Sequence, residues 1–129
     1  MEKKFYPGTW QQGRAFSPAV ATAGGRIVWL AGHGGLHGTD RTLEGDFDGQ
    51  SRQAFANLEA TLAQAGGKLS DIVTMTVFIT DSRDGNRFVE IRKEFFPDAN
   101  YPASALVTIA GLARPAMMVE IQAIAVLPD

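Results

Sequence analysis

The C-terminal part of the chain constrains the fold most, because it is apolar along nearly its whole length. The segment YPASALVTIAGLARPAMMVEIQAIAV, residues 101–126, predicts two strands, at 104–111 and 117–126, on either side of the turn LARPA. In the second strand both the odd and the even positions are apolar, so neither face of that strand is expected to meet water. A single carboxylate, Glu120, lies in its middle.

Four earlier segments complete the predicted architecture. An apolar strand is expected at 26–31, an amphipathic helix within 46–67, an alternating strand at 71–80 and a second helix within 81–102 that Pro97 ends. The order is strand, helix, strand, helix and strand pair. It predicts an α+β fold in which one strand-helix-strand crossover is followed by an antiparallel hairpin, with both helices on one face of a mixed sheet.

The number of helices available to cover this sheet predicts an oligomer. Two helices can cover only one face of a sheet of this size, and the chain offers no further helix for the other face. Another copy of the same sheet is the expected cover, so we predict a homo-oligomer with its functional site between subunits.

Length and charge narrow the class of protein. The 129 residues fit one domain, 1–129, and the 12 Lys and Arg against 14 Asp and Glu are scattered along the chain. Nucleic-acid and membrane surfaces need concentrated positive charge, so we expect neither partner. There is no cysteine, signal peptide or membrane span in the sequence, and we expect a cytoplasmic protein.

Three stretches carry a family resemblance. FSPAVATAGGRIVWLAGHGG, FANLEATLAQAGGKLSDIVTMTVFITD and YPASALVTIAGLARPAMMVEIQAIAVL resemble, in order and spacing, the RidA/YjgF family of reactive-intermediate deaminases. The resemblance covers nearly the whole chain and is most specific at 65–81 and 119–126. It implies a chorismate-mutase-like fold, a homotrimer with its sheets around a central barrel, and a small-molecule cleft at each subunit boundary.

The resemblance also gives Glu120 a role. The matching acid in the family orients a water or transfers a proton while a C=N bond is hydrolysed to a carbonyl product and ammonia. A carboxylate between Val119 and Ile121 is expected to be partly desolvated, which suits acid-base work near neutral pH. The structural alternative is that Glu120 forms an interface salt bridge or accepts hydrogen bonds from backbone amides at the subunit seam.

Other cleft positions depart from the family pattern. The arginine that grips the substrate carboxylate in active members is replaced by Ser104, which offers only a neutral hydrogen bond. A tyrosine and a serine of the family correspond to Ala19 and Ala31. The usual Asn and Tyr of the second helix appear as Val89 and Arg92.

The remaining candidates are binding residues. His33 replaces a frequent glutamine directly after the strand 26–31, where it is expected either to face the cleft or to contact solvent as a loop residue. Gly32 gives the same loop freedom to direct amides at an anion. Arg114 and Arg92 are the cations that could replace the missing arginine, although an exposed turn or helix position is the more common outcome for each. We expect no metal, because His33 and His37 have no evident third ligand, and we expect no cofactor.

Three functional classes follow. The first is a deaminase or hydrolase that acts on small imines or enamines in an altered cleft. The second is a non-catalytic homotrimer that binds a small metabolite or regulates a partner. The third is the endoribonuclease label attached to the family, against which the acidic balance and the lack of a basic stripe argue.

Overall fold

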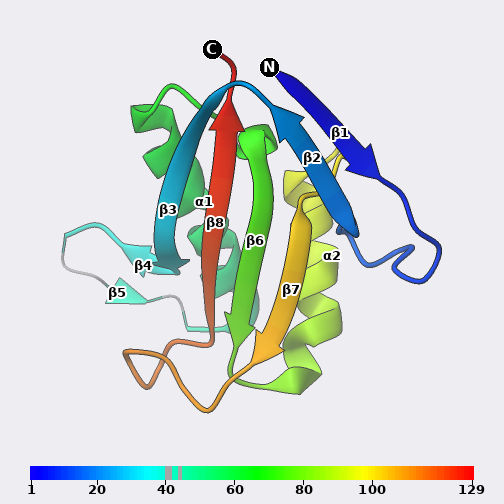
Figure 1. The fold of residues 1–129 in the computed structure, drawn as a ribbon. Helices are drawn as coiled ribbons and strands as arrows, with labels where there is room; N and C mark the ends of the chain where they lie inside the picture. The colour runs from blue at the N-terminus through cyan, green and yellow to red at the C-terminus, as the bar shows by residue number, and fades with distance from the viewer. Residues whose placement is uncertain (40–41, 44) are drawn as a thin grey trace.

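A four-stranded mixed sheet with two helices behind it forms the body of the molecule (Figure 1). The structure is a computed structural model that describes residues 1–39, 42–43 and 45–129. The strand order is β3-β8-β6-β7. The four strands are β3 (Arg26–Gly34), β8 (Val119–Leu127), β6 (Ile72–Ile79) and β7 (Ala103–Thr108).

Both helices pack on the same face of this sheet. They are α1 (Phe47–Gln64) and α2 (Gly85–Phe95). Asp46 caps α1 by accepting a hydrogen bond from the amide of Gly49 at 2.7 Å, which satisfies one of the free N–H groups of the first turn. The apolar stripe predicted for this helix is Phe55, Leu58, Leu62 and Ala65. The first three are fully buried in the core, whereas Ala65, the C-cap, is only partly buried. The α+β class with two helices on one face is therefore confirmed.

Short elements join and flank the main sheet. Single-turn 3₁₀ helices precede β6 and α2 at η1 (Leu69–Asp71) and η2 (Ser82–Asp84). Two two-stranded sheets, which the sequence did not predict, pair β1 (Glu2–Tyr6) with β2 (Ala19–Ala23) and β4 (Leu36–His37) with β5 (Thr42–Leu43).

The predicted hairpin between the last two strands is wrong. β7 pairs with β6 in parallel, whereas β8 lies between β3 and β6 and is antiparallel to both. The connection 109–118 carries the chain past the end of β6 instead of turning back on β7 (Figure 1). A strand that is apolar on both faces suits the centre of a sheet, where neighbours on both sides also cover it.

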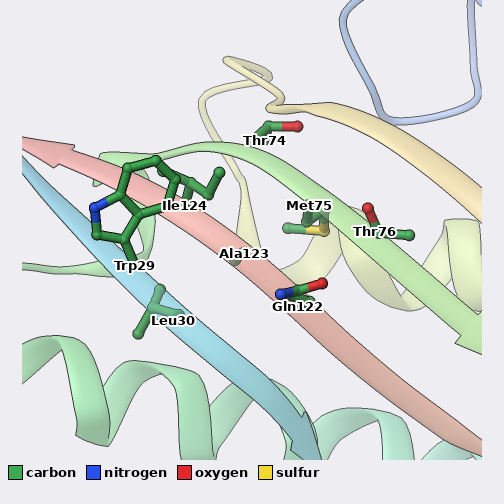
Figure 2. Close-up of a pocket in the computed structure, with 8 residues that line it drawn as sticks. All are labelled: Trp29, Leu30, Thr74, Met75, Thr76, Gln122, Ala123 and Ile124. Carbon is green, nitrogen blue, oxygen red and sulfur yellow. The ribbon is translucent and has the colours of Figure 1, made fainter.

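The second face of the sheet is open in the described part of the chain (Figure 1). Trp29 is 73 % exposed on this face, Ile27 53 % and Val107 38 %. A cavity of about 220 Å³ lies here, lined by residues of β3, β6 and β8. Among its lining residues, the Trp29 ring lies beside Ile124 above β8 (Figure 2). None of the helices in the described ranges is long and apolar enough to cross a bilayer. The expected trimer that would cover this face stays a prediction.

Candidate functional site at Glu120

Glu120 lies on the open face of β8, between Gly34 on β3 and Phe78 on β6. Its half-buried side chain extends over Gly32, where a methyl group on the glycine would lie 2.8 Å from both Cδ and Oε2 of the carboxylate. Gly32 is therefore needed for close approach and leaves room for the acid. Among the residues that the structure describes, Glu120 has no hydrogen-bond or ion-pair partner.

A β-bulge in β3 brings Gly32 to this position. Leu30 pairs with Ala123 and His33 pairs with Ile121, so two residues of β3 stand opposite the single residue between those partners on β8. The extra residue bends the strand next to Glu120. It also lets β3 continue to Gly34, beyond the predicted end at residue 31.

His33 lies inside β3 and not in the expected loop, and both of its ring nitrogens have polar partners. Its role in the cleft stays a prediction. Its Nδ1 is 2.7 Å from the carbonyl oxygen of Ala31, and its Nε2 is 2.8 Å from Oγ1 of Thr61 on α1. A carbonyl oxygen only accepts, so Nδ1 carries a proton, and in the neutral ring Nε2 accepts from the Thr61 hydroxyl. The imidazole thereby ties the bulge beside Glu120 to α1, next to an open cavity of about 360 Å³.

Ser104 and Arg92 meet on the other side of the sheet. Ser104 stands opposite Met75 on the helix-covered face, and its hydroxyl accepts a hydrogen bond from Nη1 of Arg92 at 2.7 Å. Nη2 of Arg92 donates to the carbonyl oxygen of Arg14 at 3.1 Å. Burial, and next the nearby Arg14 charge, lower the pKa of Arg92 to about 10, while Tyr101 acts in the opposite direction.

The structure brings some predicted site residues together and separates others. Gly32 adjoins Glu120 on the open face, and Arg92 adjoins Ser104 on the helix-covered face. The His33 side chain also lies on the helix-covered side, against Thr61 of α1. Arg114 lies in the connection between β7 and β8, where its carbonyl oxygen accepts from the Met117 amide. A substrate-binding role for Arg114 stays a prediction.

Three contacts were missed from the sequence: Gly32 against Glu120, Thr61 on His33, and Arg92 on Ser104. A signal for the last was present, because one arginine is lost at 104 and another gained at 92 within the same cleft of the resembling family. The bulge that creates the first contact left no such signal. In the described ranges no group of three or more metal-ligating side chains gathers.

Comparison with known proteins gives a consistent set of relatives. A family model described as Endoribonuclease L-PSP matches residues 11–127. The 2-iminobutanoate/2-iminopropanoate deaminase of Dermatophagoides farinae is 34 % identical over 113 residues, which are 87 % of this chain and 85 % of the relative.

Solved structures share the fold. A member of the conserved Rid protein family, YyfB from Yersinia pestis, superposes with a TM-score of 0.89 at 25 % identity, covering 98 % of this chain and 100 % of its own. The crystal structure of TdcF from E. coli with bound serine superposes with a TM-score of 0.73 at 29 % identity, covering 95 % of this chain and 98 % of its own.

Proposed function

Because this chain belongs to the RidA/YjgF family, we propose that it hydrolyses small imines or enamines to a carbonyl compound and ammonia. The observation that carries the proposal is the Glu120 carboxylate, half-buried beside Gly32 and without a hydrogen-bond or ion-pair partner among the described residues. The name of the 34 % identical deaminase supports the reaction class. The serine bound to TdcF supports a small-molecule ligand.

In the proposed reaction Glu120 acts on water. The carboxylate takes a proton from the water as its oxygen attacks the C=N carbon, which gives a carbinolamine. The protonated acid gives that proton to the imine nitrogen, which completes the neutral carbinolamine. Glu120 then takes the proton of the carbinolamine hydroxyl and passes it to the nitrogen, so that the C–N bond breaks, ammonia leaves and the carbonyl forms. Imine and water thus balance carbonyl product and ammonia, and no redox partner is needed.

We place the reaction in a cleft between subunits of a homotrimer. The exposed face around Trp29 gives a second copy an apolar surface to cover, and Glu120 lies on that face. Gly32 would shape the cleft beside the acid, His33 would hold the bulge in place from the helix side, and Ser104 with Arg92 would line the cleft from the edge strand β7 of a neighbouring copy.

Ammonia release from imines tests the function. An amino-acid oxidase generates the imines in the assay, and the rate of ammonia release with the protein is compared with the spontaneous rate. Glu120→Gln keeps the size of the side chain and removes the base, so we expect hydrolysis to fall about 100-fold or more with the assembly unchanged. Glu90→Gln, on the exposed face of α2, is the matched control that keeps full activity. Full activity in Glu120→Gln would contradict the proposal, and loss of both activity and assembly would support a salt-bridge role.

A second candidate follows from Ser104. The missing arginine at that position favours a protein that binds a small metabolite without turning it over, because the charged grip of active family members is absent there. The binding function is supported if the protein hydrolyses no imine faster than buffer does and still binds a small ligand.

A further inference from the structure

A cavity beside the C-terminal end of α2 is separate from the surroundings of Glu120. It lies where β1 passes the end of this helix (Figure 1) and measures about 220 Å³, several times the roughly 30 Å³ that one water occupies in the liquid. Its lining residues come from β1, η1, the end of α2 and the connection to β7, and none of them is a neighbour of Glu120. The cavity therefore offers room for a ligand outside the proposed cleft.

The apolar part of the lining is aromatic and is held by the core. Phe95 stacks on Phe55 with the ring centroids 4.4 Å apart, and Phe96 meets the same ring edge-on at 6.2 Å. Phe5 of β1 and Pro97 complete this part of the lining. Because the rings at the end of α2 are fixed by packing, an apolar group can enter the cavity without reorganising them.

Lys3 brings a positive charge to the same cavity. Its Nζ donates to the carbonyl oxygen of Ser70 at 2.8 Å and lies 5.8 Å from the centroid of the Phe5 ring, and it forms no ion pair within the described ranges. Burial lowers the pKa of Lys3, while the nearby Asp71 carboxylate acts in the opposite direction. An ammonium group has three donors, so two remain for a ligand, and a carboxylate is the acceptor that binds them most strongly.

Asp98 and Asn100 bring a negative charge and an amide to the cavity. Both line it, and neither side chain has a hydrogen bond or an ion pair in the part of the chain that the structure describes. Ala99 between them has a φ of 59° and lines a different cavity. This left-handed conformation is unfavourable for a residue with a Cβ, and it persists where the surroundings hold the backbone, often at ligand sites. The loop that carries the two polar groups is therefore fixed in shape.

We propose that this cavity binds a free amino acid with an apolar side chain. Its carboxylate would accept from Lys3, its ammonium group would donate to Asp98, and its side chain would lie among the phenylalanine rings. The charges of the lining favour this class of ligand, because a simple anion would be repelled by Asp98 and a simple cation by Lys3, whereas a zwitterion is attracted by both. The site is independent of Glu120 and of the reaction proposed there.

Binding of L-phenylalanine and two of its derivatives tests the inference. L-Phenylalaninamide lacks the carboxylate and N-acetyl-L-phenylalanine lacks the ammonium group, and dissociation constants are measured by calorimetry on the full chain. We expect the wild type to bind L-phenylalanine about tenfold or more tightly than either derivative, because each derivative loses one charge-assisted contact. No binding of L-phenylalanine, or no preference over the derivatives, would overturn the proposal.

Two variants assign the contacts. Lys3→Met keeps the apolar stem, and it should bring the ratio of the dissociation constants for L-phenylalanine and L-phenylalaninamide close to one. Asp98→Asn should do the same for L-phenylalanine and N-acetyl-L-phenylalanine. Lys4→Met is the matched control, because the Lys4 side chain lies on the other face of β1 against the Tyr6 ring, and it should keep both ratios. An unchanged ratio in Lys3→Met or in Asp98→Asn would contradict the assigned contact and with it the proposal.

Chemical shifts locate the ligand. L-Phenylalanine should shift the backbone amide signals of residues 95–100 and leave those of 119–121 unchanged. Absence of shifts at 95–100 would overturn the proposal, since the amino acid would then bind elsewhere. The dissociation constant for L-phenylalanine should be the same in Glu120→Gln as in the wild type, so a failed hydrolysis assay and a failed amino-acid site remain distinguishable.

Discussion

Glu120 and Arg92 are both charged groups that no opposite charge of the described chain neutralises. The sequence drew attention to Glu120 because a carboxylate is unusual in an apolar strand. It could not assign the neighbour of that acid, since the contact with Gly32 exists only because of the bulge in β3. Arg92 was a candidate from the sequence, but its burial and its bond to Ser104 emerge only when α2 packs on β7.

At the scale of single residues, Gly32→Ala should displace the acid. The new methyl would meet the carboxylate at 2.8 Å, and the end of a flexible side chain can rotate away, so stability should change little. Misplacement of a catalytic group by about 1 Å can cost up to about 100-fold, and we expect imine hydrolysis to fall roughly tenfold to 100-fold. Ammonia release and thermal unfolding are measured together. Gly111→Ala, where a Cβ meets nothing within 4 Å, is the control. Equal activities in the two variants would contradict the contact.

At the scale of elements, the end of β3 and the start of α1 are fitted to each other. A Cβ on Gly35 would lie 2.6 Å from Cα and 2.7 Å from the carbonyl oxygen of Gln50, so only glycine permits this approach. Gln50 in turn binds the connection before β8, donating to the Ala116 carbonyl at 3.0 Å and accepting from the Met118 amide at 2.8 Å. One buried side chain thus ties helix, strand and connection together.

Gly35→Ala should therefore destabilise the fold. The clash is with backbone atoms, which cannot rotate away, so α1 must shift and strain the hydrogen bonds of Gln50. We expect the free energy of unfolding to fall by about 1–3 kcal/mol, the usual cost of overpacking. Urea denaturation measures the difference from the wild type, and Gly111→Ala should stay within about 0.5 kcal/mol. A loss no larger than that of the control would show that the two elements can separate without cost.

At the scale of the whole molecule, the face of the sheet opposite the helices is left uncovered by the described part of the chain. Exposed apolar side chains on β3 and β7 flank Glu120 on β8, so the surface that needs a cover and the surface that carries the acid are the same. A second copy of the chain on this face would bury these apolar side chains and enclose Glu120. The proposed activity would then depend on assembly.

Trp29→Lys should abolish that assembly. A charge buried in an apolar interface has neither hydration nor a partner, so in sedimentation velocity we expect this variant to have the mass of one subunit and the wild type that of a trimer. Trp10→Lys is the matched control, because Trp10 is equally exposed, at 74 %, but lies in the N-terminal segment against Phe16. A monomeric wild type at high concentration, or a trimeric Trp29→Lys, would contradict the predicted interface.

The sequence by itself determined the α+β class, both helices, the two-sided apolarity of the last strand and the presence of an acid within it, because these follow from local periodicity and composition. Only the tertiary structure decided the position of β8 between β3 and β6, the bulge that places Gly32 under Glu120, and the meeting of Arg92 with Ser104. These depend on pairings between segments far apart in the chain. A pattern of apolar residues specifies which face a strand buries, but it does not specify with which neighbouring strand it pairs.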